Sequence, residues 1–452
     1  MASTYLQISS SSGSNTTGTF SAWIKRGNLS STQCPIGVQV DGNNFINIQF
    51  NSSNQLNLRW YDDGSPDANY NTTAVFRDVS AWYHVVIAFD TTQSTSSDRV
   101  KVYVNNTLYS LSGYPPQNNT IMFNTGSATV QVGSSGFANS FLDGSMAHVH
   151  WIDGTQYAAS DFGETDATTG IWKPKTAPSV TYGTNGFFLK FENSGAFGTD
   201  SSGNANNFTV NGTMTQTIDT PSNVFATFNP LTIPSSSGLT LSDGNLSLSG
   251  SSTDAGAKAT LGVSSGKWYW EVKANVASSG SDRHLVATDI VRQITSATDP
   301  NSQGIWGIQS RSGSGATLNS YTNGTFSNVN TGSTGYDDNT IISVALDMDN
   351  GKLYFAKNGT WTDLAGNVGD PVAGTNPTFT GLPTDGTIIL PYVENRNPGT
   401  PSSQINFGNG YFGTTAVSSA QNPDDGIGIF EYSVPTGYKA LCTKSINAQE
   451  YS

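Results

Sequence analysis

The distribution of hydrophobic and polar positions predicts antiparallel β-strands along almost the whole chain. Apolar residues occupy alternate positions in short segments, and clusters of Gly, Asn and Asp separate one segment from the next. A period of two residues is typical of half-buried strands, whereas amphipathic helices repeat every 3.6 residues. In the first half, the segments with this pattern are TFSAWIKRG (19–27), FINIQF (45–50), QLNLRWYDDG (55–64), WYHVVIAFD (82–90), VKVYVNN (100–106), ATVQVGSS (128–135) and MAHVHWIDG (146–154). Their spacing of roughly ten residues favours a β-sandwich over βαβ units.

The second half repeats the pattern and predicts a second sandwich. Its segments are GKWYWEVKAN (266–275), GIWGIQS (304–310), TIISVALDMD (340–349), KLYFAKNG (352–359), TIILPYVEN (387–395) and SQINFGNG (403–410). One short helix is expected in QYAASDFGET (156–165), and GFFLKFE (186–192) is expected to be a closing strand that pairs with the opening YLQIS.

A Pro, Ser and Asn-rich stretch at residues 220–238 marks the expected domain boundary. The sequence therefore predicts an all-β protein with two antiparallel β-sandwich domains, residues 1–225 and 226–452. Two hairpins support the duplication: VVIAFDTTQSTSSDRVKVYVNNTLY (85–109) and LDMDNGKLYFAKNGTW (346–361) share the plan of strand, polar turn and strand.

The charge and the short apolar runs argue against two kinds of partner, nucleic acids and membranes. Only 12% of the 452 residues are charged, aromatics reach 11%, and the net charge is -13. A nucleic acid backbone would be repelled by this charge, so we expect no nucleic acid partner. No apolar run approaches the ~20 residues of a membrane helix, so we expect no membrane insertion.

The ends and the cysteines give an expected compartment. MASTYLQISSSSG lacks the basic and apolar regions of a signal peptide, which predicts folding in a reducing cytoplasm. The two cysteines, Cys34 and Cys442, lie far apart in the sequence and are expected to be buried thiols rather than a disulfide framework or a metal knuckle.

Local motifs connect the two halves to known families. WYHVVIAFD, the hairpin that follows it, and FLDGSMAHVHWIDG (141–154) resemble the laminin-G and pentraxin-like branch of concanavalin-type jelly rolls, over roughly residues 1–192. GVSSGKWYWEVK, LDMDNGKLYFAKNG and INFGNGYF resemble a SPRY domain, which is also a bent β-sandwich. The resemblance implies a jelly-roll domain followed by a SPRY-like domain.

The order of further segments resembles a modular virion protein of tailed bacteriophages, especially those of marine bacteria and cyanobacteria. The segments are TFSAWIKRG, FGETDATTGIWKPK, YGTNGFFLKFENS, DSSGNANNFTV, DTPSNVFATFNPL and GYKALCTKSIN. This resemblance implies a structural protein on the exterior of the particle, made in the host cytoplasm, with other virion proteins as partners.

No segment carries the paired carboxylates of a glycanase. Retaining enzymes need two carboxyl groups about 5 to 5.5 Å apart, yet Glu192, Glu271 and Glu394 each stand alone in their segments. Adjacent pairs such as Asp62 and Asp63 lie in polar loops, where turn chemistry explains them. A P-loop, a nucleophile elbow and a dinucleotide fingerprint are also missing from the sequence. We therefore predict that the protein is not an enzyme.

Metal ligation is weakly indicated. His148 and His150 share one face of a predicted strand, but a packed or solvent-facing pair explains them more simply than zinc. Laminin-G and pentraxin relatives often bind calcium at the rim, and this chain offers suitable oxygens on Asp90, Asp98, Asn105 and Asp143. Because Asn and Asp turns are frequent throughout, we expect no cofactor, with Ca²⁺ as the one candidate.

Sugar binding requires an aromatic face beside polar groups that bond hydroxyls. The segment RWYDDGSPDANYN (59–71) and three segments of the second half provide such residues, although Trp60 and Trp306 can equally belong to the cores. The candidate binding residues are Trp60, Tyr61, Asp62, Asp63, Tyr70, Trp306, Arg311, Tyr336, Asp337 and Arg396. In SPRY domains, binding falls on loops at one end of the sandwich, so the resemblance implies one end for the last five.

Three functions follow from these features. The first is a tail fibre or tail-associated adhesin that binds host surface polysaccharide through loops on a rigid scaffold. The second is a head-surface fibre or capsid decoration protein that acts by protein contacts. The third, a polysaccharide depolymerase, is disfavoured by the missing carboxylate pattern. A homo-oligomer is expected only on general grounds.

Overall fold

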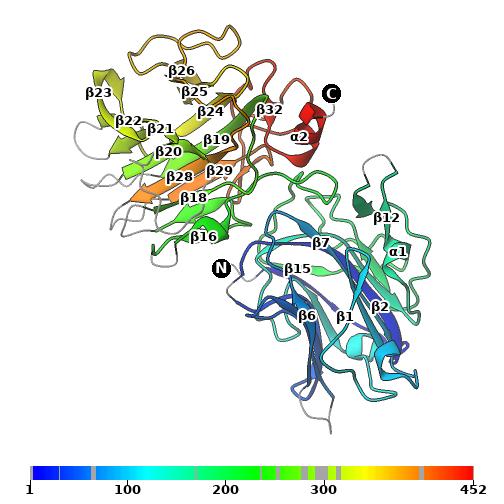
Figure 1. Ribbon diagram of the computed structural model, residues 1–452. Coiled ribbons are helices and arrows are strands. Elements are labelled where there is room, and N and C mark those ends of the chain that lie inside the picture. The colour runs from blue at the N-terminus through cyan, green and yellow to red at the C-terminus, as the bar shows by residue number, and fades with distance from the viewer. Residues whose placement is uncertain are drawn as a thin grey trace. The chain divides into compact units, whose positions relative to one another are not determined.

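The computed structural model describes residues 4–29, 31–62, 68–167, 170–234, 237–250, 255–275, 283–290, 304–311, 317–396 and 402–450. The chain is nearly all-β, as the sequence predicts. It divides into two compact units, Met1–Gln216 with Thr220–Ser222, and Thr217–Asp219 with Asn223–Ser452. In Figure 1 the first unit runs from blue to green, and the second runs from green to red.

The N-terminal unit is a sandwich of two antiparallel sheets. The seven-stranded sheet has the order β15 (Thr209–Asn211), β1 (Tyr5–Ser9), β10 (Thr129–Val132), β3 (Gln33–Asp41), β4 (Asn44–Phe50), β5 (Gln55–Tyr61) and β6 (Ala68–Val75). The six-stranded sheet has the order β14 (Phe187–Leu189), β11 (Gly144–Asp153), β2 (Thr17–Arg26), β7 (Trp82–Asp90), β8 (Val100–Val104) and β9 (Thr107–Tyr109).

Alternation along these strands builds the N-terminal core. Ile46 and Ile48 of β4, for example, are buried in the core that also holds Val85 and Ile87 of β7. A second apolar cluster covers the outer face of the six-stranded sheet, where Phe162 and Trp172 pack. These two residues belong to α1 (Ala159–Phe162) and to the hairpin of β12 (Gly163–Thr165) and β13 (Trp172–Pro174).

The C-terminal unit is a second sandwich. The path through its larger sheet is β16 (Thr240–Ser242), β17 (Ser247–Ser249), β29 (Ser402–Asn406), β19 (Lys267–Asn275), β24 (Ile341–Asp347), β25 (Lys352–Lys357) and β26 (Thr360–Thr362). Two short strands join it off this path, β27 (Phe379–Thr380) beside β25 and β32 (Lys439–Ala440) parallel to β19. The second sheet has the order β18 (Ala255–Lys258), β28 (Ile389–Arg396), β20 (Arg283–Ile290), β21 (Ile305–Arg311), β22 (Thr317–Thr322) and β23 (Thr325–Thr334).

The remaining elements of this unit are short. The segment after β29 forms β30 (Tyr411–Phe412) and β31 (Thr415–Ala416), and helix α2 (Thr443–Glu450) follows β32. Three single turns of 3-10 helix occur in the chain, at Ser96–Asp98, Met122–Asn124 and Pro230–Thr232, among the residues described above.

Both predicted hairpins are confirmed by the strand register. In the first unit, β7 and β8 pair with Phe89 opposite Val100, and in the second unit β24 and β25 pair with Asp347 opposite Lys352. The predicted short helix is also present, as the single turn of α1.

One predicted pairing is wrong. Strand β14 was expected to pair with the opening strand β1, but β14 pairs with β11 in one sheet and β1 pairs with β10 and β15 in the other. The closing partner of β1 is Thr209–Asn211, which is too short for its alternation to be recognised in the sequence. The predicted boundary at residue 225 compares with a second unit whose continuous part begins at Asn223.

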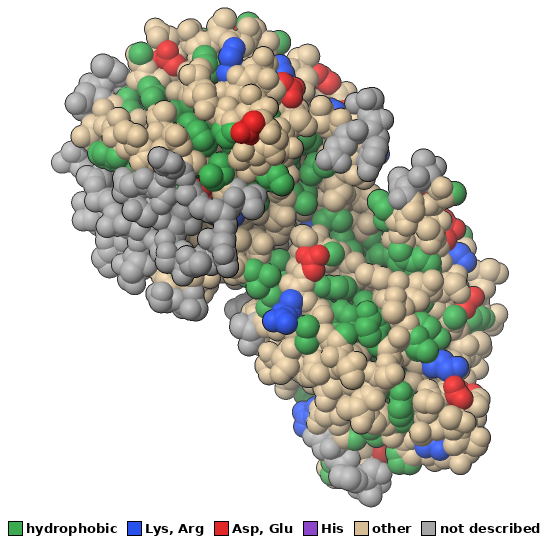
Figure 2. All heavy atoms as spheres, in the orientation of Figure 1, with side chains coloured by type: hydrophobic (Ala, Val, Ile, Leu, Met, Phe, Trp, Pro, Cys, Tyr) green, Lys and Arg blue, Asp and Glu red, His purple; other side chains and the backbone are tan. Residues whose placement is uncertain are grey.

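The surface and the cysteines agree with the composition. The face drawn in Figure 2 carries charged side chains that are scattered rather than gathered into a block of one sign. Cys34 and Cys442 are both buried and free, as predicted, and burial raises the pKa of each thiol. Within the described ranges, no helix is long and apolar enough to cross a membrane.

Candidate functional site

The N-terminal candidates are divided between the two faces of the seven-stranded sheet. Trp60 and Tyr70 point towards the core, whereas Tyr61 lies on the outer face because neighbouring residues of a strand alternate. A single sugar ring therefore has no access to both Trp60 and Tyr61. This separation follows from the period of two residues that predicts the strand itself.

Trp60 is a correction to the sequence analysis. Its side chain is only 2% exposed, and its ring packs edge to face on Phe89 at 5.9 Å. Tyr70 is partly buried against the same core, and desolvation raises its pKa. With its ring enclosed, Trp60 offers no face on which a sugar could stack, so it is a core residue.

Tyr61 belongs to a polar outer face that the sequence analysis did not assemble. Its ring stacks on Phe45 at 5.8 Å, and the Arg59 guanidinium lies 5.1 Å from the centre of the Phe45 ring. On the same face of the sheet, Gln49 donates to Asn57 over 2.8 Å, and Asn57 donates to Asn71 over 3.0 Å. The signal was present in the sequence, because Gln49, Asn57 and Arg59 occupy the polar positions of alternating strands.

Of the two aspartates that follow β5, the structure describes only Asp62. Asp62 Oδ2 accepts a hydrogen bond from the backbone of Thr120 over 3.4 Å, so this carboxylate helps to hold a neighbouring loop. Asp63 lies outside the described residues.

Among the C-terminal candidates, Tyr336 is a second correction. It is 2% exposed, and its hydroxyl donates to the carbonyl of His284 over 2.5 Å. Tyr336 is therefore an internal anchor rather than a ligand contact. Its neighbour Asp337 is exposed, in a turn closed by the hydrogen bond from Thr340 N to the Asp337 carbonyl.

The strand register places Arg311 and Arg396 at the same level of the sheet. Both stand directly opposite Arg283 of β20, one on each side, because β21 and β28 flank that strand. The sequence analysis missed Arg283, since the pairing of three distant strands brings it between the other two. Trp306 is the second residue of the strand that Arg311 ends, about 17 Å away at 3.4 Å per residue. The expectation that Trp306 and the two arginines share one end of the sandwich is therefore wrong.

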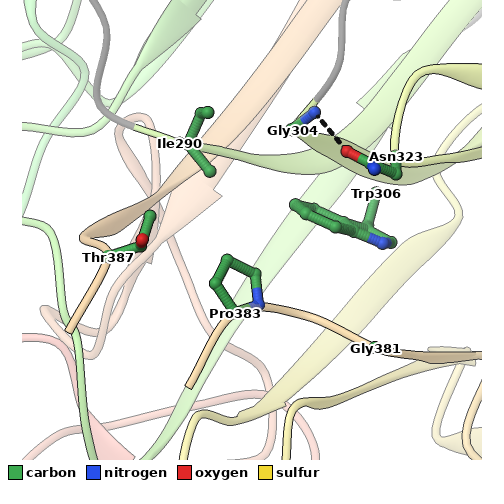
Figure 3. Close-up of a pocket in the computed structure, with 7 residues that line it drawn as sticks. All are labelled: Ile290, Gly304, Trp306, Asn323, Gly381, Pro383 and Thr387. Atoms are coloured by element: carbon green, nitrogen blue, oxygen red, sulfur yellow. Dashed lines mark hydrogen bonds between the residues drawn. The ribbon is translucent and has the colours of Figure 1, made fainter. Parts of the chain in front are cut away.

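Trp306 instead lines an open pocket at the other end of the C-terminal sandwich (Figure 3). Its volume is about 280 Å³, and its described lining comes from the smaller sheet and from the connection between β27 and β28. The lining residues are Ile290, Gly304, Trp306, Asn323, Gly381, Pro383 and Thr387. Although the residue as a whole is 4% exposed, the indole has one part in the core cluster and another on the pocket wall.

Local structure explains how these residues meet. Ile290 ends β20 and Trp306 lies near the start of β21, while Asn323 occupies the turn from β22 to β23 at a φ of 50°. Pro383 and Thr387 belong to the connection from β27 in one sheet to β28 in the other. The pocket therefore lies where the chain crosses between the two sheets.

Hydrogen bonds fix the polar groups of the pocket. Asn323 Oδ1 accepts from Gly304 N over 2.7 Å, which orients the side-chain amide. Thr387 Oγ1 donates to Asp385 Oδ1 over 2.6 Å, in a local turn. Within its described lining, the pocket has no ionisable side chain, so that lining offers no acid, base or metal ligand.

A buried Ser and His pair in the N-terminal unit resembles a nucleophile with its base but has the wrong proton arrangement. Ser21 Oγ lies 2.9 Å from His84 Nε2, and the indole Nε1 of Trp172 donates to His84 Nδ1 over 3.0 Å. Because an indole N–H can only donate, Nδ1 must accept and the ring proton must be on Nε2. His84 therefore donates to Ser21 and cannot remove its proton, and both side chains are fully buried.

The two histidines considered for zinc are separated by packing and by a bulge. Strand β11 changes register between Ala147 and His150, and His148 has a φ of 48°. The His150 ring stacks on Phe188 at 3.9 Å, and its Nδ1 lies 3.0 Å from the Tyr182 hydroxyl. Burial lowers the pKa of both histidines. In the part of the chain that the structure describes, no three His, Cys, Asp or Glu side chains gather as metal ligands.

The oxygens considered for calcium serve the turns in which they lie. Desolvation, the largest single effect, acts to raise the pKa of the Asp90 carboxyl, but the hydrogen bonds that Asp90 accepts from Thr92 and Gln93 together lower it. Asn105 Oδ1 accepts from His84 N over 2.8 Å, and Asp98 pairs with Lys101 at 3.4 Å. Calcium binding stays an expectation from the resemblance.

Glu271, which the sequence analysis treated as an isolated carboxylate, binds the C-terminal segment to the larger sheet. Its two oxygens accept from the backbone N–H groups of Glu431 and Tyr432 over 2.9 and 2.8 Å, and from the hydroxyl of Tyr269 over 2.9 Å. Desolvation raises the pKa of Glu271 to about 7 in spite of these donors. The alternation in KWYWEVK does not indicate this role, because Glu271 contacts residues that lie 160 positions later in the chain.

Comparison with known families gives each unit a class. Residues 1–160 match the concanavalin A-like lectin/glucanases superfamily, and residues 267–393 match the SPRY domain. The chain thus contains a concanavalin-like domain followed by a SPRY domain, which confirms that part of the predicted resemblance. Both are binding-type folds, and they suggest a carbohydrate- or protein-binding role.

Two solved structures resemble the chain over less than half of its length. The crystal structure of the TRIM65 PSpry domain is 15% identical, covers 40% of this chain and 91% of its own, and has a TM-score of 0.27. The SPRY domain of human HERC1 is 15% identical, covers 39% and 96%, and has a TM-score of 0.28. At these scores the two likenesses add nothing to the family matches. Among curated proteins, none matches the sequence.

Proposed function

We propose that the protein is a non-catalytic structural protein on the exterior of a phage virion, a tail fibre or tail-associated adhesin that binds host surface glycan. The observation that supports the binding role most directly is the tandem of two binding-type sandwiches. Sandwiches of this kind hold loops on a rigid scaffold, and many weak contacts on one particle add up to firm attachment.

The virion part of the proposal rests on the recurring order of sequence segments. Two of them, DTPSNVFATFNPL (219–231) and GYKALCTKSIN (437–447), lie more than 200 residues apart in the chain. In the structure they meet: Ala226 N donates to the Leu441 carbonyl over 3.0 Å, and Phe225 bridges to Cys442. This contact gives a physical reason for the two segments to recur together in one kind of protein.

The non-catalytic part rests on proton chemistry. The Ser21 and His84 pair noted above has its ring proton on the side facing Ser21, and general base catalysis needs that nitrogen unprotonated. A second pair, Ser403 Oγ at 2.6 Å from His284 Nε2, is fully buried and therefore out of reach of a substrate. The open pocket has no ionisable group in its described lining. These observations disfavour a polysaccharide depolymerase.

Immunogold labelling of intact phage particles, with an antibody against this chain, tests the proposal. Label confined to the tail supports the adhesin. Label scattered over the head contradicts it and favours the alternative, a head-surface fibre or decoration protein that acts by protein contacts. Absence of label from every particle rejects the virion assignment, and release of reducing ends from host capsule by the purified protein rejects the non-catalytic assignment.

A further inference from the structure

We propose that the pocket beside Trp306 binds one neutral sugar ring, such as a terminal hexopyranose of a surface glycan. This inference rests on the proposed glycan-binding function, and it adds the location of a site and the class of its ligand. Four features of the pocket support it: its size, the lack of charge in its described lining, its apolar walls and the placement of its two polar side chains (Figure 3).

The size suits a single ring. The pocket volume is about 280 Å³. It lies just below the range of about 300 to 1,000 Å³ in which drug-sized ligands bind. A single pyranose ring fits such a space.

The charge of the lining selects a neutral ligand. None of the seven described lining residues is Asp, Glu, Lys, Arg or His. A carboxylate or phosphate that entered would lose hydration without gaining an opposite charge, which is costly. The described lining therefore suits a neutral sugar better than an acidic one such as a uronic acid.

The apolar walls suit the C–H groups of a sugar ring, and the half-buried Ile290 and Pro383 supply most of this surface, because Trp306 is only 4% exposed. Figure 3 shows the Trp306 indole beside the Pro383 ring, with Ile290 across from them. Trp306 is held by the core cluster, so its ring is positioned before any ligand arrives. Gly304 has a φ of 96°, and a Cβ there would lie 2.5 Å from Ile290 Cγ1, so this glycine leaves room for the Ile290 wall.

The two polar side chains complement sugar hydroxyls, which both donate and accept. Asn323 uses Oδ1 to accept from Gly304 N, and its Nδ2 group is left as a donor towards a ligand. Thr387 uses its proton for Asp385, and its Oγ1 lone pairs are left as acceptors. In Figure 3 the two residues stand on opposite sides of the pocket. A purely apolar ligand would bury both groups unpaired, at about 1 to 3 kcal/mol for each.

Saturation-transfer NMR with methyl glycosides of glucose, galactose and mannose tests this inference, with the full chain as receptor. Thr387→Tyr fills the pocket and is expected to abolish transfer to the bound glycoside. Thr384→Tyr is the matched control, because it places the same side chain at an exposed position of the same connection, outside the lining. Thr387→Val keeps the shape and removes the acceptor, so we expect binding that is roughly three- to tenfold weaker.

The inference is supported if at least one glycoside receives saturation from the wild type and from Thr384→Tyr but not from Thr387→Tyr. It is overturned if no glycoside binds the wild type, if Thr387→Tyr binds as well as the control, or if benzene, an apolar probe, binds this pocket in preference to all three glycosides. Because particle labelling does not depend on this pocket, tail label combined with any of these results rejects the pocket assignment and leaves the proposed adhesin intact.

Discussion

The indole N–H of Trp172 donates to Nδ1 of His84 over 3.0 Å, and so holds a fully buried histidine in its neutral form. Desolvation lowers the pKa of His84 to about 3, from 6.5. The folded N-terminal unit therefore resists protonation of a group that the unfolded chain protonates readily. Stability from this source is complete above pH 6.5 and is lost as the pH falls towards 3.

We predict that the N-terminal unit is the acid-sensitive one. Between pH 7.5 and 5, His84 alone costs about 2 kcal/mol of unfolding free energy, from 1.36 kcal/mol per pKa unit. In the C-terminal unit, the pKa of His284 is also lowered to about 3, but the pKa of Glu271 is raised to about 7. The folded state then binds a proton at Glu271 between pH 7 and 4.5, which stabilises it on acidification and offsets His284.

The two cysteines allow each unit to be followed separately. Cys34 lies in the N-terminal unit and Cys442 in the C-terminal unit, and both are buried. Pulsed thiol labelling after equilibration in urea at pH 7.5 and pH 5 should show the larger loss of midpoint at Cys34. His84→Gln should reduce that difference. Equal shifts at the two cysteines would contradict the assignment.

Substitution of Trp60 should damage the fold and not a ligand contact. Trp60→Ala removes a buried indole, and such truncations cost about 3 to 5 kcal/mol. Tyr61→Ala on the outer face should cost much less, because its ring is partly exposed. Urea midpoints read at Cys34 distinguish the two variants. A stable Trp60→Ala protein with weakened cell adsorption would restore Trp60 as a binding residue.

Glu271→Gln should loosen the C-terminal segment locally. The amide presents only one acceptor oxygen, so one of the backbone N–H groups of Glu431 and Tyr432 loses its partner. Hydrogen exchange at residues 429–433 should become at least several-fold faster. Glu431→Gln is the control, because its carboxylate accepts from Ser418 and its change leaves both bonds to Glu271 in place. Unchanged exchange in Glu271→Gln would show that these bonds do not hold the segment.

Lys258 and Asp289 form a buried ion pair at 2.8 Å, with side chains 4% and 0% exposed. Lys258→Met should lower the free energy of unfolding by about 3 to 5 kcal/mol, because it leaves the buried carboxylate of Asp289 without this counter-charge. The double variant Lys258→Met, Asp289→Asn should recover most of that loss, since it removes both charges. Urea midpoints of thiol labelling at Cys442 measure the stability of both variants. A double variant no more stable than Lys258→Met would show that the charge of Lys258 contributes little to burying Asp289.

The sequence predicts most of the sandwich architecture because its strands carry their own signal. Period two in WYHVVIAFD and KWYWEVK identifies β7 and β19, and it also decides which residues face the core. The wrong predictions concern which strands pair with each other, and not where the strands lie in the sequence. Strand β15 is three residues long and lacks a recognisable alternation, so the local sequence did not indicate its pairing with β1.

The candidate site was only partly predictable for a related reason. Trp306 was selected as an aromatic residue, but its pocket depends on Asn323 and Thr387, which the fold brings together from separate turns. The position of Arg283 between Arg311 and Arg396 likewise comes from sheet order. Residue type can indicate a binding group, whereas a shared site requires the register between strands that are distant in the sequence.

The hydrogen bonds that join the beginning of each unit to its end have an evolutionary consequence. In the first unit Tyr5 pairs with Asn211, and in the second Ala226 bonds to Leu441. Each unit is thus entered and left by the chain at nearly one place, the arrangement in which a domain can be inserted or replaced without cutting its core. Genetic exchange could therefore swap either unit as a cassette, and lineages carrying this protein should differ by whole-unit replacement more readily than by junctions inside a sandwich.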